Sequence, residues 1–265
     1  MKKFYYPGDK FPSVSITGRY CALSCPHCEG RFLKGMKAIS NPGELYDFAV
    51  EHDRSGGNGF LLSGGFTEEG YVPLENFFDV LSKIKETTSL EINVHTGIPT
   101  EEIVEGLISS SVDAVSYDMI GSQETIARVY GLNVTPEDYK HGYEMLKKRG
   151  LKVVPHITVG LNRGEIDGEF KALEMLETPS TLVLNTLIPG DFGERVEKED
   201  LLAVMDHVSE RTEVILGCMR ERGRSQLEIE ALERGAEGVV IPSIETVDWA
   251  EKRFDIKRLE KCCVL

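Results

Sequence analysis

Three cysteines near the start of the chain have a spacing that suits metal chemistry. Cys21, Cys25 and Cys28 lie in the run Arg19-Tyr-Cys-Ala-Leu-Ser-Cys-Pro-His-Cys28, directly after a β-branched stretch, Val14–Thr17, that predicts a strand. A loop of this length can bring three thiolates to three corners of a [4Fe–4S] cluster, whereas an electron-transfer cluster of this type uses four cysteines. One iron is then left open for a substrate-like ligand.

The competing interpretation of this loop is a zinc knuckle. A structural zinc ion takes two paired sets of ligands, so a second C-x2-C or H-x3-H is expected nearby. None follows within the next fifty or so residues. The number of donors therefore favours a cluster over zinc.

The C-x3-C-x2-C pattern resembles the cluster loop of the radical SAM enzymes, with His27 in the position where that family usually has an aromatic residue. The resemblance implies that Cys21, Cys25 and Cys28 hold a [4Fe–4S] cluster whose open iron chelates S-adenosylmethionine (SAM). One electron from the cluster then breaks the sulfonium and gives a 5′-deoxyadenosyl radical. An electron donor of ferredoxin or flavodoxin type is implied as well. The chemistry belongs to the cofactor, and the protein supplies positioning and excludes water.

The composition is that of a soluble globular protein, with 41% hydrophobic and 28% charged residues. A net charge of -14 gives no basic surface for a phosphate backbone, which argues against nucleic acid as a partner. No apolar run approaches the ~20 residues that span a bilayer, and the N-terminal residues lack the apolar core of a signal peptide. The sequence thus predicts a cytoplasmic protein with no membrane segment.

The remaining cysteines are Cys218, Cys262 and Cys263. In a cytosolic chain they favour metal or redox use over disulfides, because the cytosol keeps thiols reduced. The last four residues, Cys262–Leu265, also match the C-a-a-X prenylation pattern. Stable anchoring generally takes two signals, and no strongly polybasic segment precedes the motif, so prenylation is the weaker interpretation.

Eight short apolar runs recur along the chain, each followed by a longer segment with helical spacing. Eight such units, averaging about 33 residues, are typical of βαβ architecture. The sequence predicts a single domain over residues 1–265 with an α/β fold, a complete (β/α)8 barrel of TIM type. The alternative is the partial (β/α)6 barrel common among radical SAM enzymes, with a C-terminal extension. The eight runs are Val14–Thr17, Phe60–Ser63, Leu90–Val94, Ala114–Tyr117, Leu151–Thr158, Leu182–Asn185, Val214–Gly217 and Gly238–Ile241.

Two segments carry clear helix signals. Between Pro73 and Thr87, apolar residues recur with the 3.6-residue period of one helix face, which should pack on the sheet. The run Thr135-Pro-Glu-Asp138 offers a capping threonine, a proline at the first helical position and acids in the first turn. The matching end is Lys147–Gly150.

Polar residues follow several of the predicted strands, at the barrel mouth where such folds place reactive groups. Ser63-Gly-Gly-Phe66 resembles the family's glycine-rich motif for the SAM amino group, with Phe66 in place of the usual acid; the alternative is an ordinary strand-to-helix turn. By analogy with biotin synthase, Asp118 could hold the ribose or methionine portion of SAM. A lone histidine at a strand end is more often structural than a ligand contact. The candidates for SAM contact are His27, Ser63, Gly64, Gly65, His95, Asp118, His156 and Asn185.

A second group of cysteines offers a second metal site. Cys218 follows the seventh predicted strand, and Cys262 and Cys263 lie in a tail, residues 260–265, that can fold back over one rim. If that rim is the mouth, three thiolates converge and can hold an auxiliary [4Fe–4S] cluster. The alternatives are a small core residue for Cys218 and a disordered tail.

An arginine after the seventh strand helps ligate the second cluster of biotin synthase, and Arg220, Arg222 and Arg224 occupy a comparable stretch here. Taken together, these features resemble the sulfur-inserting branch of biotin and lipoyl synthases, and most closely the compact component of the archaeal-type two-component lipoyl synthase. The resemblance implies sulfur insertion into a protein-bound octanoyl chain. It also implies two partners, an octanoylated carrier protein and a second radical SAM protein.

Two alternatives to sulfur insertion remain open at the level of sequence. One is a radical SAM enzyme of different outcome, such as a mutase, methylase or C–C bond former with a single cluster. The other, from a different class, is a non-enzymatic iron–sulfur carrier.

Overall fold

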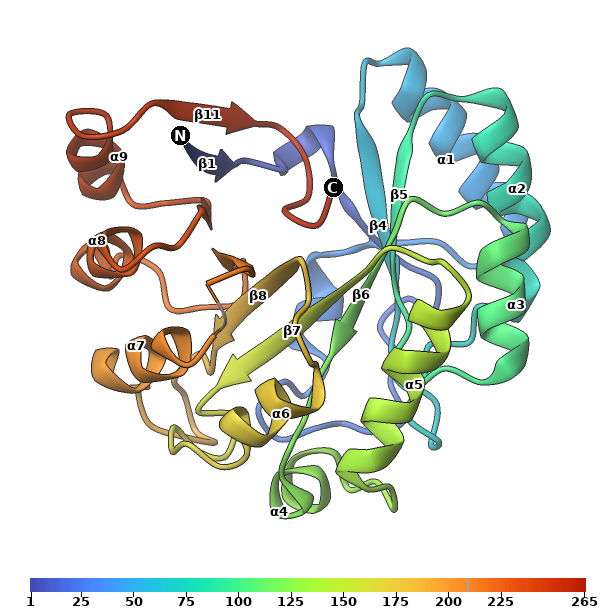
Figure 1. Ribbon diagram of the computed structural model, residues 1–265. Coiled ribbons are helices and arrows are strands. Elements are labelled where there is room, and N and C mark those ends of the chain that lie inside the picture. Colours follow the sequence, from blue (N-terminus) through green and yellow to red (C-terminus); the bar gives the residue numbers. More distant parts are fainter. Residues whose placement is uncertain (209) are drawn as a thin grey trace.

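The computed structural model describes residues 1–208 and 210–265. These residues form one curved sheet of 11 strands with helices on its outer side (Figure 1). All pairs of neighbouring strands are parallel, in the order β11-β1-β10-β9-β8-β7-β6-β5-β4-β2-β3. The strands are β1 (Lys2–Tyr5), β2 (Ser13–Ser15), β3 (Lys37–Ala38), β4 (Gly59–Ser63), β5 (Glu91–His95), β6 (Ala114–Asp118), β7 (Val153–Val159), β8 (Thr181–Thr186), β9 (Glu213–Leu216), β10 (Gly238–Val240) and β11 (Ile256–Leu259).

The helices follow the strands in alternation. The α-helices are α1 (Pro42–Arg54), α2 (Phe78–Thr87), α3 (Glu101–Ser109), α4 (Gln123–Thr125), α5 (Pro136–Lys148), α6 (Glu169–Met175), α7 (Lys198–Asp206), α8 (Ser225–Glu233) and α9 (Ile244–Ala250). Short 3-10 turns form η1 (Gly8–Lys10), η2 (Arg31–Gly35) and η3 (Glu75–Phe77), and a π-helical turn forms η4 (Ile126–Tyr130).

The predicted α/β barrel-type fold is confirmed. The eight expected strands are β2 and β4 to β10, and they lie side by side in sequence order. Three further strands, β1, β3 and β11, were not expected. The N-terminal strand β1 pairs with both β10 and β11, so β10 does not reach β2. The described sheet therefore has two edges, β3 and β11, and is open as in the partial-barrel alternative, although it contains eight expected strands rather than six.

The predicted helix signals are confirmed as well. The Thr135 hydroxyl accepts a hydrogen bond from the Asp138 amide, and the Asp138 carboxylate accepts one from the Thr135 amide, which together make a capping box for α5. Along η3 and α2 the apolar stripe faces the core. Its residues Leu74, Phe77, Leu81 and Ile84 are buried.

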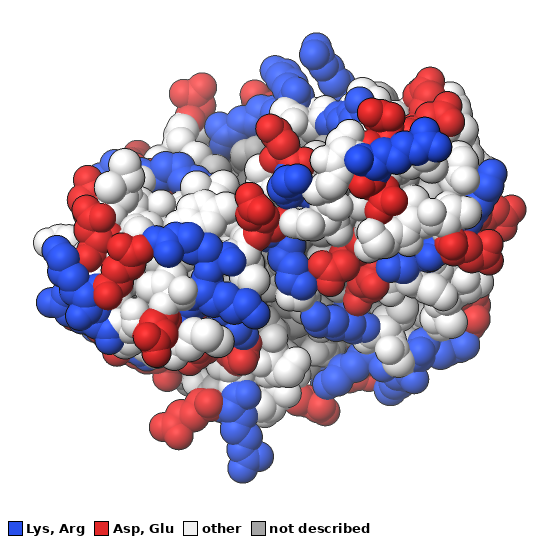
Figure 2. Space-filling view, turned by 90° about the horizontal axis from the view of Figure 1, so that it is seen from above, with Lys and Arg blue, Asp and Glu red and all other residues white. Residues whose placement is uncertain are grey.

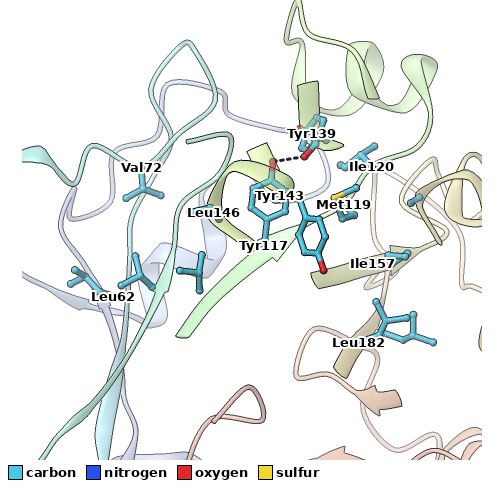
Figure 3. Close-up of a cluster of buried hydrophobic side chains, with 14 of the residues drawn as sticks. Leu62, Val72, Tyr117, Met119, Ile120, Tyr139, Tyr143, Leu146, Ile157 and Leu182 are labelled. Carbon is cyan, nitrogen blue, oxygen red and sulfur yellow. Dashed lines mark hydrogen bonds between the residues drawn. The ribbon is translucent and has the colours of Figure 1, made fainter. Parts of the chain in front are cut away.

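The outer core lies between the sheet and the helices, and Figure 3 shows the part around β6 and α5. Tyr117 points outward from β6, and its hydroxyl donates to the main-chain oxygen of Tyr139 at 2.8 Å. A Cβ at Gly142 would lie 2.4 Å from that hydroxyl oxygen. Glycine at this position thus lets α5 approach the sheet while the buried phenol keeps a partner.

A second, smaller core lies on the inner side of the sheet. Its strand residues alternate with those of the outer core, as the two-residue period of a strand requires. They pack on one another and on the C-terminal residues Cys263 and Val264, with Leu259, Cys262 and Leu265 at the border of the cluster. The strand residues of this inner core are Tyr5, Ala114, Val154, Val183, Ile215 and Val240.

The tail, residues 260–265, enters the barrel interior from the end where β4 and β5 begin. The Asn58 side chain donates to the Glu260 carbonyl at 2.8 Å, and Lys261 forms an ion pair with Glu91 at 3.2 Å. Figure 1 shows the C-terminus inside the ring of strands, between β11 and β4. The tail therefore closes the floor of the barrel, opposite the mouth. The C-a-a-X motif is packed into this floor, which argues against prenylation.

The surface carries charges of both signs. On the face shown in Figure 2, acidic and basic side chains are interspersed rather than gathered in one basic area. Among the described residues there is no helix whose length and apolar character would let it cross a membrane.

The contact between α2 and α3 gives a stability prediction. A Cβ at Gly106 would lie 2.2 Å from the Phe78 ring, so Gly106→Ala should lower the free energy of unfolding by about 1–3 kcal/mol through overpacking. Urea denaturation followed by circular dichroism measures this change. The matched control is Gly35→Ala, where no atom lies within 4 Å, and a change there within about 0.5 kcal/mol is expected. Equal losses in the two variants would contradict the assignment.

Candidate active site

The cysteine loop follows β2 and is bound to the segment that follows β4. The Thr17 hydroxyl accepts from the Gly65 amide at 2.7 Å and donates to the Tyr20 carbonyl at 2.8 Å. The Phe66 amide donates to the Cys21 sulfur at 3.3 Å. These hydrogen bonds, all within the protein, hold Cys21 at the mouth of the barrel.

Gly65 is required by this contact. A Cβ there would lie 1.9 Å from the Tyr20 carbonyl oxygen and 2.6 Å from the Cys21 Cα, distances that no side chain could tolerate. A Cβ at Gly64 would meet its nearest atom, on the Thr17 side chain, at 3.1 Å, so this position is less crowded. The resemblance to the family's glycine-rich motif implies that these glycines contact the amino group of SAM. In the structure, the space freed by Gly65 is filled by the cysteine loop itself.

The three cysteines of this loop lie close enough together for the charges of Cys21 and Cys28 to act on Cys25. Cys25 begins a turn in which its carbonyl accepts from the amides of Cys28 and Glu29, at 2.9 and 2.7 Å. Burial and then the neighbouring Cys21 and Cys28 raise the pKa of the Cys25 thiol to about 12. Nowhere in residues 1–208 or 210–265 do three His, Cys, Asp or Glu side chains form a group that could hold a single metal ion. A cluster keeps its thiolates further apart than one ion does.

His27 lies between the second and third of these cysteines with an unsatisfied ring nitrogen. Its ring packs edge-on against Tyr130 and Phe192, with centroids 5.9 and 6.4 Å away. Its Nδ1 is buried and has no hydrogen-bond partner among residues 1–208 and 210–265. Burial lowers the pKa of His27 to about 4, so the ring is neutral at neutral pH. A buried polar atom without a partner indicates that a ligand atom completes it.

His95 and Asp118 form a charged pair at the ends of β5 and β6. His95 Nε2 lies 2.9 Å from Asp118 Oδ2, and its Nδ1 lies 3.5 Å from the Ser63 hydroxyl. The two side chains are 25% and 34% exposed, so they border open space. Burial lowers the pKa of His95, but the charge and hydrogen bond of Asp118 outweigh it and the net shift is upward. Burial alone would raise the pKa of Asp118. The charge and hydrogen bond of His95 lower it by more, so the net shift of the Asp118 pKa is downward.

His156, on the next strand, is held as a neutral ring. Its Nδ1 lies 3.0 Å from the Val154 carbonyl, which can only accept, so Nδ1 carries the proton and Nε2 keeps a lone pair. Burial lowers the pKa of His156 to about 4. The pKa of His95 is therefore raised while those of His27 and His156 are lowered, because only His95 touches the Asp118 carboxylate directly.

A pocket at the ends of β6 and β7 joins several of these groups. Asp118 and His156, expected from the sequence, line it. Tyr130 also lines it and was missed; it ends the π-helical turn η4, a feature that occurs frequently at functional sites but leaves no clear trace in sequence. The other polar side chains of the lining are Thr125, Thr158, Asp167 and Glu169.

Asn185 is placed differently from the other candidates. It is 5% exposed, and its side-chain oxygen accepts from the Met219 amide at 3.3 Å. A Cβ at Gly217 would lie 2.1 Å from that oxygen. Asn185 thus supports the loop that carries Cys218.

Cys218 lies just beyond β9 and is exposed. The Cys218 thiol reaches solvent, but the protein around it removes enough water to raise its pKa, and the charge of Cys262 adds to this shift. The tail that carries Cys262 and Cys263 comes from the floor rather than over the mouth. The convergence of the three cysteines on one cluster therefore stays a prediction.

The arginines after β9 bind protein atoms. Arg220 is 3% exposed, pairs with Glu228 at 2.5 Å and donates to the Gly217 carbonyl at 2.6 Å. Arg222 donates to the Cys218 carbonyl at 2.9 Å. Arg224 donates to the Val196 carbonyl at 2.7 Å. The analogy with the cluster-binding arginine of biotin synthase therefore does not extend to Arg220, whose charge is already matched.

A model of the radical SAM superfamily matches residues 15–174, more than half of the chain. The chain belongs to the radical SAM superfamily. The matched part runs from β2 through α6 and so includes the cysteine loop, the glycine segment and the His95–Asp118 pair. No curated protein matches the chain.

Solved radical SAM structures share this fold. Methylornithine synthase has a TM-score of 0.61 at 14% identity, over 89% of this chain and 73% of that one. The FeFe-hydrogenase maturase HydG from Carboxydothermus hydrogenoformans has a TM-score of 0.61 at 17% identity, over 90% of this chain and 58% of that one. Streptococcus suis SuiB bound to S-adenosylmethionine has a TM-score of 0.54 at 12% identity, over 93% and 54%. Identities this low show the fold alone.

The residues present fit a radical SAM cofactor. The three thiols of the loop supply the donor set, and the Phe66 amide already donates to one of them. Nδ1 of His27 has no hydrogen-bond partner among the described residues, and Nε2 of His156 has a lone pair to accept a hydrogen bond. Cys21, Cys25 and Cys28 would hold the cluster.

The three histidines give a titration prediction. In Asp118→Asn, burial acts on His95 without an opposing charge, so the pKa of His95 should fall from above 6.5 to below it. NMR of protein with 15N-labelled histidine measures this change. His156 is the internal reference, since its pKa should stay well below 6.5 in both proteins. A His95 pKa that is unchanged in the variant would contradict the pairing.

Proposed function

We propose that this radical SAM enzyme inserts sulfur into unactivated C–H bonds, most specifically those of a protein-bound octanoyl chain, as a lipoyl synthase component does. The observation that carries the proposal is a second group of cysteines inside the barrel. Cys218 comes from the loop after β9, and Cys262 and Cys263 come from the floor. A radical SAM enzyme with one cluster has no need of this group.

When bound at the mouth, the cluster and SAM supply a 5′-deoxyadenosyl radical that takes a hydrogen atom from carbon. The residues around them orient and shield this chemistry. His27 and His156, both neutral, offer ring nitrogens without adding charge. Asp118 accepts hydrogen bonds from ligand hydroxyl groups and keeps its charge because His95 pairs with it.

Three other predicted contacts are also part of the proposal. Ser63 sets the orientation of the His95 ring through its hydroxyl. The main chain of the segment Gly64–Gly65 would contact the amino group of SAM with atoms other than the Gly65 amide, which already donates to Thr17. Asn185 acts through the loop that it supports rather than by touching SAM.

A closed floor supports chemistry that must exclude water. Cys263 and Val264 are 8% and 2% exposed and pack on the apolar inner core. Substrate then enters at the mouth, where an acyl chain on a carrier protein can reach inward. A second radical SAM protein and a ferredoxin- or flavodoxin-type donor are the other proposed partners. An auxiliary [4Fe–4S] cluster between Cys218 and the tail is the proposed source of sulfur.

A second candidate is a single-cluster radical SAM enzyme that acts on a polar substrate, such as a mutase. The observation in its favour is the polar interior above the floor. Asn93 and Ser116 are both buried and hydrogen-bonded at 2.9 Å, directly below His95 and Asp118 on the same strands. An aliphatic chain would gain little from such a lining.

Iron content separates these candidates. After anaerobic reconstitution with iron and sulfide, sulfur insertion requires about eight irons per chain, as two [4Fe–4S] clusters contain. Cys218→Ala should retain about four and still cleave SAM, whereas Cys21→Ala should release no 5′-deoxyadenosine. About four irons in the unaltered protein would exclude the sulfur-donor role.

The product separates them again. With an octanoyl peptide, SAM and reductant, mass spectrometry should show sulfur added to the peptide. An unchanged peptide together with 5′-deoxyadenosine would favour the polar-substrate candidate. A complete absence of 5′-deoxyadenosine would favour a non-enzymatic iron–sulfur carrier.

A further inference from the structure

We infer that Cys262 and Cys263 form a reversible disulfide with each other, which makes the floor of the barrel sensitive to oxidants. Both are free thiols in the structure. The inference goes beyond the proposed function and does not depend on it, because this disulfide needs neither iron nor a third cysteine. The co-reactant is a small disulfide molecule, R–S–S–R, which the two thiols reduce.

The two cysteines are neighbours in the chain and are joined by a trans peptide bond. Their Cα atoms are therefore about 3.8 Å apart. Most disulfides join Cα atoms that are roughly 4.4–6.8 Å apart, so a bond between these two sulfurs is strained. Strained disulfides are the ones that are easily reduced and that serve in regulation. The spacing therefore indicates a reversible bond rather than a permanent one.

The end of the chain is already bent at this pair. The Leu265 amide donates to the Cys262 carbonyl at 3.2 Å, which closes a tight turn over the last four residues. The two thiols are also hydrogen-bonded to each other. Closing a ring across a single peptide bond requires the main chain to bend there. The turn thus brings the two sulfurs together before any bond forms.

The two thiols differ in their access to a small molecule. Cys262 is only partly buried and lies at the border of the inner core. Cys263 is 8% exposed and packs in that core with Tyr5, Val183 and Val240. Redox-sensitive cysteines are commonly an accessible thiol beside a second thiol that resolves the first product. Cys262 is therefore the residue that reacts first, and Cys263 is the residue that resolves.

Asn93 holds the sulfur of Cys262 in place. Its side-chain nitrogen donates to that sulfur at 3.5 Å. Asn93 is 1% exposed, and Ser116 on the neighbouring strand holds its amide through two contacts, at 2.9 and 3.2 Å. The donor therefore belongs to the sheet and not to the tail. The sulfur that reacts first is thus fixed to the barrel wall, while its partner lies on the turn.

The reaction is an ordinary thiol–disulfide exchange in two steps. The Cys262 thiolate attacks one sulfur of R–S–S–R and expels R–S⁻, which leaves a mixed disulfide. The Cys263 thiolate then attacks the Cys262 sulfur, forms the protein disulfide and expels the second R–S⁻. Two electrons pass from the cysteine pair to the small disulfide, and the two thiol protons end on the two R–S⁻ groups. An excess of small thiol reverses both steps.

The bond has a structural consequence for the floor. Cys263 and Val264 are the residues of the tail that fill the inner core. Bond formation draws the Cys263 sulfur toward Cys262 and away from its apolar neighbours, so the packing of the floor is loosened. Reduction restores it. Oxidation of the pair thus opens the end of the barrel opposite the mouth.

Peptide mapping tests the bond directly. Trypsin cleaves after Lys261 and releases Cys262–Leu265, a peptide that contains both cysteines of the pair and no other. The iron-free full chain is reduced, treated with 2-hydroxyethyl disulfide, alkylated with iodoacetamide and digested. Mass spectrometry should show this peptide without alkyl groups and lighter by two hydrogen atoms. Dithiothreitol before alkylation should return it with two alkyl groups.

A matched pair of variants tests the order of reaction. Cys263→Ser should stop at the mixed disulfide on Cys262. Cys262→Ser should form several-fold less mixed disulfide, because Cys263 is buried. Circular dichroism confirms that both variants are folded. Equal amounts of mixed disulfide in the two variants would contradict the assigned order.

Hydrogen–deuterium exchange tests the effect on the floor. Amides of residues 260–265 should exchange several-fold faster in the oxidised protein than in the reduced protein. The oxidant should leave this exchange unchanged in the double variant Cys262→Ser/Cys263→Ser, which cannot form the bond. Equal exchange in the oxidised and reduced protein would show that the bond does not loosen the floor.

Two mapping results would overturn the inference. One is a Cys262–Leu265 peptide that stays fully alkylated after treatment with the oxidant. The other is a cross-link between this peptide and the separate tryptic peptide that carries Cys218. Iron content keeps the proposed function apart. About eight irons per chain without the disulfide would leave sulfur insertion standing, and the disulfide with about four irons would support only the redox pair.

Discussion

The packing of the tail against the inner face of the sheet is the constraint on which the rest of the structure depends. The sheet has free edges at β3 and β11, so no strand pairing seals its interior. Cys263 and Val264 provide that seal by covering the apolar inner residues of six strands. The floor then sets the depth of the interior, the side from which substrate can enter and the place of the second group of thiols.

At the mouth, burial and one ion pair together set which of the titratable side chains are charged. Four titratable side chains, His27, His95, Asp118 and His156, lie near one another and are each partly buried. Only one ion pair among them is satisfied by direct contact, and the other two rings stay neutral. The site thereby retains one carboxylate to accept hydrogen bonds and several uncharged partners. An uncharged histidine is also a poor proton source, which suits radical chemistry.

The features that could be predicted from the sequence are those set by the spacing of residues close together in the chain. The cysteine loop, the eight inner strands and the cap at Thr135 are signals within a few residues, and the fold class followed from them. Strands β1 and β11 were not predicted because each contains two basic residues in four and is a strand only through pairing with segments far along the chain, β1 with β10 and β11, and β11 with β1. The supporting role of Asn185 and the pairing of Arg220 depend on contacts far along the chain. The path of the tail could not be predicted either, since its partners Asn58 and Glu91 lie about 170–200 positions away.

The pairing of β1 with β10 and β11 has a consequence for biogenesis. Residues 2–5 leave the ribosome long before their partners, residues 238–240 and 256–259. During translation β1 must therefore wait as an unpaired extended chain while the intervening units fold. The sheet can be completed, and the tail packed into the floor, only after the last of these partners has emerged. The interior of the barrel is thus closed post-translationally, whereas the loop at residues 21–28 can be formed while synthesis continues.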